Sequence, residues 1–242
     1  MKKLLIIICS MVMLQSCTEE DLKSVLNNGT GLSNEEIIEG LKSALNVGTD
    51  TSVTILNKVN GYFLDETVKI LLPPEAQAIY TNIGKVPGGS LLLDETIRSM
   101  NRAAEDAAVE AKPIFVDAIT GITIEDGLGI LNGNEDAATQ YLKGKTFNSL
   151  TAAFSPKINT SLSKELIPGL SANSAYTNLV SAYNTASLDG LLFPKITNTN
   201  LADHVTKKAL DGLFLKVALE EKDIRNDPLA RVNDILKKVF GK

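Results

Sequence analysis

The sequence contains few of the side chains on which most protein chemistry depends. Its 242 residues include two cysteines, one histidine and no tryptophan. Both cysteines, Cys9 and Cys17, lie near the beginning, so the chain after them can form no disulfide, iron–sulfur cluster or cysteine-ligated zinc site. Because His204 is the only histidine, metal motifs that need two histidines are excluded as well. We therefore expect no metal and no cofactor.

Aromatic residues and long apolar runs are also scarce. Aromatic residues make up 5% of the chain, which disfavours a sugar-binding module with flat aromatic platforms. The longest apolar run covers about eleven residues, 4–14, whereas a membrane-spanning helix needs about 20. Lys2 and Lys3 precede this run and the small residue Ser16 follows it. That order predicts a secretory signal peptide over residues 1–16.

Cys17 indicates that the predicted signal peptide is that of a lipoprotein. The run Leu14-Gln15-Ser16-Cys17 resembles a bacterial lipobox, which implies cleavage before Cys17 and lipid attached to its sulfur. More than one acyl chain anchors a protein stably. We therefore expect the membrane to be a partner through a lipid anchor on Cys17, with the protein in the outer membrane, on its periplasmic face or on the cell surface. The alternative is a free thiol near a processed N-terminus.

The charge of the chain excludes one large class of partner. The net charge is −5 at pH 7, and it becomes −7 without residues 1–16, because Lys2 and Lys3 are the only charged residues there. Nucleic-acid binding relies on clustered lysine and arginine, and the sequence has no basic stripe. We therefore expect no nucleic-acid partner.

Helical spacing dominates the remainder of the chain. We expect residues 17–32 to be the lipidated cysteine and a polar tether, and residues 33–242 to form one all-α domain of roughly nine to eleven helices. Ser33 and Glu36 form a capping box at its start, and Gly48 weakens the helix that follows. The main helices are expected at 90–112 with an end or kink at Pro113, at 124–131, at 135–143 behind a cap at Asn134, at 146–166 with a kink at Pro156, at 173–186, at 201–224 and at 228–240.

Several ordered motifs resemble one known family, DUF4197, a domain of unknown function in Gram-negative bacteria. The resemblance covers roughly residues 35–241 and implies a helical exported domain, commonly in lipoproteins, with no established activity. The motifs that carry it lie at residues 99–105, 111–119, 130–133, 137–142, 208–214, 220–225 and 227–231.

Charged residues in three of these motifs are the candidate site. They are Arg102, Glu105, Glu221, Arg225 and Arg231. They could line a charged pocket for a small ligand, but pairing at three- and four-residue spacing on helix surfaces is the simpler interpretation.

The sequence gives little indication of catalytic residues. Glu220 and Glu221 point about 100° apart on a helix and cannot act as facing carboxylates. His204 has no accompanying nucleophile motif, so we expect a solvated or hydrogen-bonded ring. There is no GxSxG elbow and no phosphate-binding loop. We predict no catalytic residues.

Three functions stay open at this point. We favour a structural or protein-interaction role in the cell envelope. The alternatives are a carrier that holds an apolar ligand between helices and an enzyme of unrecognised type. A large apolar cavity would favour the carrier, converging ionisable groups in a wet pocket the enzyme, and a solid core with an exposed apolar patch the interaction role.

Overall fold

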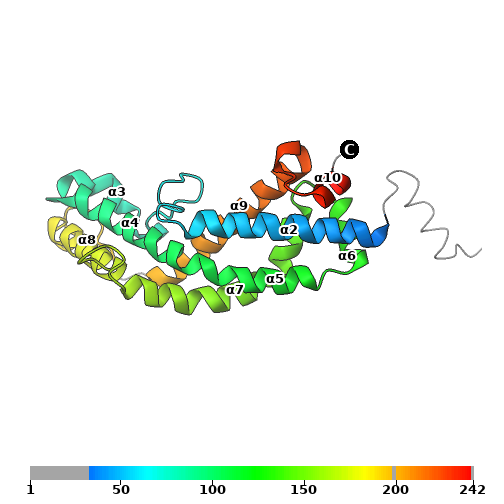
Figure 1. Cartoon of the computed structure of the whole chain (residues 1–242). Helices are drawn as coiled ribbons and strands as arrows, with labels where there is room; N and C mark the ends of the chain where they lie inside the picture. The colour runs from blue at the N-terminus through cyan, green and yellow to red at the C-terminus, as the bar shows by residue number, and fades with distance from the viewer. Residues whose placement is uncertain (1–32, 198–199, 241–242) are drawn as a thin grey trace, which may run out of the picture.

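The protein is an elongated bundle of helices. The computed structural model describes residues 33–197 and 200–240 (Figure 1). Its α-helices are α2 (Asn34–Asn57), α3 (Ala78–Asn82), α4 (Gly89–Ala107), α5 (Ala111–Thr120), α6 (Ile124–Leu131), α7 (Ala137–Ser163), α8 (Ala172–Ala186), α9 (Leu201–Asn226) and α10 (Asp234–Phe240). Single 3-10 turns lie at Pro74–Ala76, Ile83–Lys85, Ala108–Glu110 and Pro228–Ala230.

The all-α prediction is confirmed. The described residues form no strand, and their one β-bridge is isolated, between Ile167 and Leu170. The predicted number of helices is slightly too high, because eight of the described helices have seven residues or more and α3 is a single turn of five. Within the same residues, none of the helices is long and apolar enough to cross a membrane.

The beginning of α2 follows the sequence prediction, and its middle does not. The Ser33 hydroxyl accepts from the Glu36 amide at 3.2 Å, and the Glu36 carboxylate accepts from the Ser33 amide at 2.9 Å. Gly48 does not interrupt the helix. A Cβ on Gly48 would lie 3.4 Å from Cβ of Glu220, an ordinary contact distance, so α2 runs beside α9 at this point without requiring the glycine.

The helix breaks fall elsewhere than at the prolines. The expected helix 90–112 ends at Ala107, and a 3-10 turn over 108–110 leads into α5. Pro113 lies in the first turn of α5, where an amide has no intrahelical acceptor to lose. The expected helices 135–143 and 146–166 are one helix, α7, which runs through Pro156, and its N-cap is Asp136 rather than Asn134.

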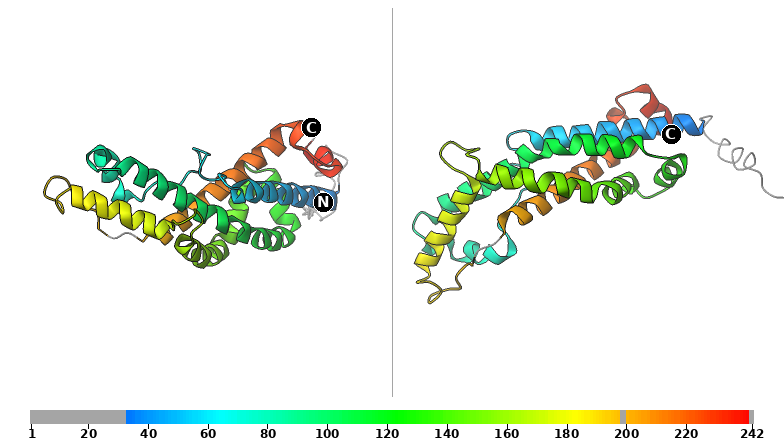
Figure 2. Two further views of the ribbon diagram at one scale, coloured as in Figure 1. Left: turned by 60° about the vertical axis from the view of Figure 1, so that its left-hand side comes forward. Right: turned by 90° about the horizontal axis from the view of Figure 1, so that it is seen from below.

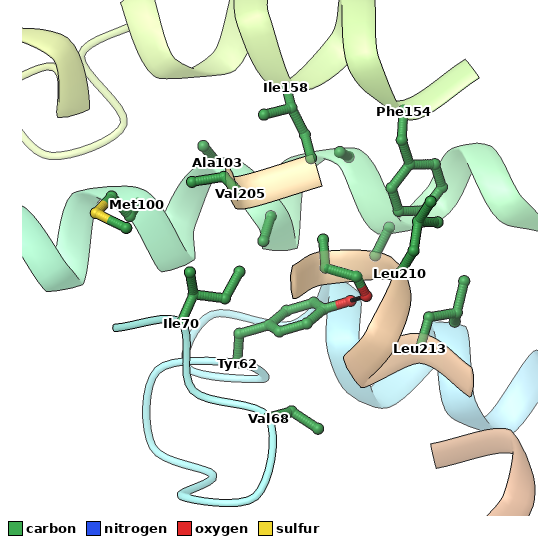
Figure 3. Close-up of a cluster of buried hydrophobic side chains, with 14 of the residues drawn as sticks. Tyr62, Val68, Ile70, Met100, Ala103, Phe154, Ile158, Val205, Leu210 and Leu213 are labelled. Carbon is green, nitrogen blue, oxygen red and sulfur yellow. Dashed lines mark hydrogen bonds between the residues drawn. The ribbon is translucent and has the colours of Figure 1, made fainter. Parts of the chain in front are cut away.

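The core follows the long helices. α7 packs on α9, α4 on α8, and α2 on α9. The alanine-rich face of α4 and its continuation is fully buried, as its spacing predicts. Figure 3 shows Tyr62, from the loop after α2, between side chains of α4, α7 and α9, and its hydroxyl donates to the Ala209 carbonyl at 2.8 Å. The loop after α2 is thus part of the core.

The last helix is shorter than expected. We predicted one amphipathic helix over 228–240, but α10 begins at Asp234, and Leu229 is 89% exposed. The Asp227 carboxylate accepts from the Leu229 amide at 2.8 Å, which closes a 3-10 turn instead of an α-helix. Leu236 and Val239 are the buried residues of the stripe, Phe240 is partly buried beside them, and α10 packs on α2.

The two ends of the bundle hold different elements. Figures 1 and 2 show the start of α2 together with α6 and α10 at one end, and α3, α8 and the loop after α8 at the other. We call residues 187–197, which follow α8, the distal loop.

Candidate functional site

Glu105 binds the loop that follows α2. Its carboxylate, 3% exposed, accepts from the amides of Tyr62 at 3.1 Å and Phe63 at 3.2 Å through Oε1, and of Asn60 at 3.1 Å through Oε2. Arg102 Nη1 lies 2.5 Å from Oε2, and Arg102 Nη2 donates to the Asn60 side chain at 2.7 Å. Asn60 has a left-handed backbone, with φ 72°, so the pair holds a tight turn in place.

Glu221 caps a neighbouring helix. Its carboxylate, 8% exposed, projects from α9 to the first turn of α7. It accepts from the amides of Ala138 at 3.0 Å and Thr139 at 2.8 Å, and from the Thr139 hydroxyl at 2.8 Å. A carboxylate suits this place, because the first amides of a helix lack partners and carry partial positive charge.

Two arginines complete this cluster. Arg225 donates to Glu221 at 2.8 Å and to the Ile130 carbonyl at 3.1 Å. Arg231 donates to the carbonyls of Ile224 at 3.1 Å and Arg225 at 3.0 Å, at the C-terminal end of α9. The five predicted site residues therefore form two clusters, one on α4 and one around the end of α9, and each joins helices or loops through backbone groups.

A small apolar cavity adjoins Glu221 and Arg225. Its volume is about 20 Å³, and Leu41, Val217 and Phe240 help to line it. A water molecule needs about 10–15 Å³ of such volume, whereas small-molecule sites usually have 300–1,000 Å³. The cavity has room for about one water and none for an apolar cargo.

A larger, open cleft lies between residues 67–77 and α9, and we call it the His204 cleft. Its volume is about 330 Å³. His204 Nε2 lies 2.8 Å from the Leu71 carbonyl oxygen, and burial lowers the pKa of the ring below its usual value of 6.5. The residues that line it are Thr67, Val68, Lys69, Leu71, Leu72, Pro74, Gln77, His204, Lys208, Asp211, Gly212 and Leu215.

Sequence reasoning expected His204 to be solvated or hydrogen-bonded and missed the cleft around it. The sequence pattern could have indicated one wall of the cleft, because His204, Lys208 and Leu215 recur at helical spacing and so lie on one face of α9. The other half is irregular chain that no periodicity describes.

The distal loop exposes three leucines, Leu188, Leu191 and Leu192, and Leu191 is 79% exposed. Leu188 and Asp189 have left-handed backbones, with φ of 51° and 56°, a conformation that is unusual for a leucine.

Hydrogen bonds hold the base of the distal loop. Asn184 donates to the Ile196 carbonyl and accepts from the Ile196 amide, both at 2.9 Å. Phe193 is buried edge-on against Tyr183, with the ring centroids 5.0 Å apart. A fixed base thus presents the exposed leucines.

The structure does not reach the predicted lipid anchor, and it can be searched for metal sites only within the described residues. Cys17 and residues 17–32 lie outside the described residues, so lipidation and the tether stay predictions. Among the residues that are described, no group of three or more histidine, cysteine, aspartate or glutamate side chains is placed to hold a metal ion.

Comparison with known proteins adds one result. No curated protein and no solved structure matches the sequence. Residues 31–241 match the family described as "Protein of unknown function (DUF4197)". The match spans nearly the whole chain, as the ordered motifs indicated, and the protein belongs to the DUF4197 family.

Proposed function

We propose that the protein is a lipoprotein anchored in the outer membrane through Cys17, which acts in the cell envelope by binding a protein partner. The distal loop carries this proposal. Exposed apolar groups that cluster on an ordered surface commonly mark interaction sites, and Leu188, Leu191 and Leu192 are exposed together on a loop whose base is fixed.

The shape of the bundle supports this arrangement. The start of α2 and the distal loop lie at opposite ends (Figure 2). The tether predicted over residues 17–32 would join an anchor on Cys17 to the start of α2, and it would reach about 20 Å on average if it behaves as a flexible chain of about 15 residues. The distal loop would then point away from the anchoring membrane, toward partners in the periplasm or outside the cell.

The other two functions receive less support. A carrier that holds an apolar molecule between helices needs an enclosed apolar cavity far larger than the 20 Å³ beside Glu221, and the 330 Å³ His204 cleft is open and partly lined by polar and charged side chains. An enzyme needs a reactive group that a base or a metal activates, and the His204 ring instead bonds to the Leu71 carbonyl. Protein interaction is therefore the function that we favour.

The partner is tested with a double substitution, Leu191→Ser with Leu192→Ser. A matched control, Leu229→Ser with Val232→Ser, removes two exposed apolar side chains near α10, at the other end. After cross-linking in cells and purification from native membranes, we expect a specific protein to be recovered with the parent and the control, and lost with the distal-loop variant. Equal recovery of that protein with the distal-loop variant would rule the loop out. Binding of the parent to protein-free vesicles through the loop would mean that lipid is its target.

The anchor is tested separately. Cys17→Ser should abolish lipid attachment and the cleavage before residue 17, and a variant that stays membrane-bound and is processed like the parent would contradict the anchor. Sedimentation of the parent with inner-membrane markers would contradict the outer-membrane location. Digestion by protease on intact cells would indicate surface display, and protection would indicate the periplasmic face.

A further inference from the structure

We infer that the His204 cleft is a binding site for a small amphipathic carboxylate. The anionic head would lie between Lys69 and Lys208, and the apolar body would lie on Leu71, Pro74 and Leu215. This site is independent of the distal loop and does not depend on the proposed protein partner.

The cleft has the size and the stability of a formed site. Its 330 Å³ falls at the lower end of the range of small-molecule pockets. One wall is a continuous face of α9. A Cβ on Gly212 would lie 3.0 Å from the Tyr62 ring and 3.1 Å from Cβ of Val68, so the glycine lets the second wall pack directly on α9.

The second wall is irregular chain, but it is held at several points. Ile70 exchanges two hydrogen bonds with the buried Asn101 side chain, at 2.9 and 2.8 Å. The Leu72 amide donates to the Tyr80 hydroxyl at 3.2 Å, and Gln77 donates to the Leu72 carbonyl at 2.7 Å. A ligand would therefore meet a preformed wall and would not have to order it, which reduces the cost of binding.

The charges in the cleft favour an anion. Lys69 is paired with Glu66 at 3.0 Å and Lys208 with Asp211 at 3.8 Å, and Glu66 is a largely exposed residue outside the cleft lining. The Lys208–Asp211 pair is exposed and therefore weak, so a ligand carboxylate can replace Asp211. Lys69 is held more firmly, because its side chain is 22% exposed and its ammonium also lies 5.0 Å from the centroid of the Phe63 ring. Two lysines face one acidic residue, Asp211, in the lining, although the chain as a whole is acidic.

The apolar part of the lining narrows the class of ligand. Leu71, Pro74 and Leu215 are the exposed apolar residues of the lining, with Leu71 48% and Leu215 39% exposed, whereas Val68 and Leu72 beneath them are already buried. A free phosphate or acetate would leave the exposed side chains uncovered, whereas a carboxylate with a short apolar chain covers them and gains from their removal from water. His204 adds no charge at pH 7, because burial lowers the pKa of its ring below 6.5, and its Nε2 faces the Leu71 carbonyl.

His204 also makes the test direct. As the only histidine, it gives unambiguous imidazole signals in NMR spectra of the full chain, purified in detergent without a histidine tag. We expect hexanoate to shift these signals saturably, and acetate and inorganic phosphate to bind at least about tenfold more weakly. Lys69→Gln and Lys208→Gln should each weaken hexanoate binding by about tenfold or more.

The control is Lys207→Gln, which removes a neighbouring exposed lysine that does not line the cleft. It should change hexanoate affinity by less than about twofold, because exposed charges act weakly on one another. Unchanged melting temperatures would show that all three variants are folded. The proposal fails if hexanoate gives no saturable shift, if phosphate binds as tightly as hexanoate, or if Lys207→Gln weakens binding as much as Lys208→Gln does.

Discussion

At the scale of single residues, two buried carboxylates hold backbone segments of this protein in place. Moving a carboxylate out of water is costly unless hydrogen bonds and an opposite charge replace the lost hydration. Glu105 and Glu221 obtain both, from backbone amides of other segments and from Arg102 and Arg225. Each therefore fixes a piece of backbone that the sequence alone would leave loose.

Glu105→Gln should destabilise the fold strongly. The glutamine loses the ion pair with Arg102 and turns an NH₂ group toward amides that need an acceptor. We expect a loss of about 2–4 kcal/mol in the free energy of unfolding, measured by urea denaturation. The control is Glu110→Gln, which breaks a partly exposed pair with Lys157 and should cost less than about 1 kcal/mol. Equal losses in the two variants would contradict the role assigned to Glu105.

His204 should make stability depend on pH just below neutrality. Burial lowers its pKa in the folded protein below 6.5, so between these two pKa values the unfolded chain binds more protons. The free energy of unfolding therefore rises with pH across this window. The contribution of His204 to stability is fully present above pH 6.5 and is lost as the pH falls through the window below it.

The pH effect is checked against His204→Gln, whose amide can still donate to the Leu71 carbonyl but does not titrate. Urea denaturation at a series of pH values from 7.5 to 5 should show the parent losing stability relative to this variant as the pH falls. A constant difference across the series would mean that His204 has an ordinary pKa.

The sequence identified the charged residues of the Glu105 and Glu221 clusters, but it did not identify the backbone groups with which they form hydrogen bonds. The spacing of Arg102 and Glu105, and of Glu221 and Arg225, indicated ion pairs along one helix. The backbone amides that donate hydrogen bonds to each carboxylate lie on segments more than 40 residues away in the chain. No local pattern contains that information, because it depends on how the helices pack.

At the scale of elements, the capping box predicted at Ser33 is confirmed, because its side chains close the first turn of α2. The cap predicted at Asn134 is wrong, since the N-cap of α7 is Asp136, and the capping box at the start of α6 was not predicted. Pro113 misled the prediction of a helix end, because it is accommodated in the first turn of α5, whereas Pro156 lies inside a helix, as expected. Apolar spacing misled the prediction at the C-terminus, where Leu229 and Val232 fit the stripe in sequence but are exposed.

The end of the chain offers a direct test of this correction. Leu236 is fully buried in a small cluster with Ala44 and Ile224, so Leu236→Ala should cost about 2–4 kcal/mol in the free energy of unfolding. Leu229→Ala, the matched control, should cost less than about 0.5 kcal/mol, as surface substitutions usually do. If chemical denaturation shows the reverse order, the continuous helix predicted over 228–240 is the better description.

At the scale of the whole molecule, the long helices connect the two ends of the bundle. α4 packs on α8 toward one end and on α7 and α9 toward the middle, while α9 continues to α2 and α10. One apolar cluster extends from Leu41 on α2 to Phe193 in the distal loop. The prediction of a single domain over 33–242 agrees with this continuity but needs a thermodynamic test.

We expect the chain to unfold in one cooperative transition, because a break anywhere along α4 or α9 exposes core at both ends. Leu179→Ala, in α8, and Leu236→Ala, in α10, remove fully buried side chains near opposite ends. In calorimetry of the full chain, each should lower the temperature of the same single transition, by roughly 5–10 °C for a cost of about 2–4 kcal/mol in a protein of this size. If Leu179→Ala instead produces an early step in which only part of the helical circular dichroism is lost, the end that carries the distal loop is a separate unit.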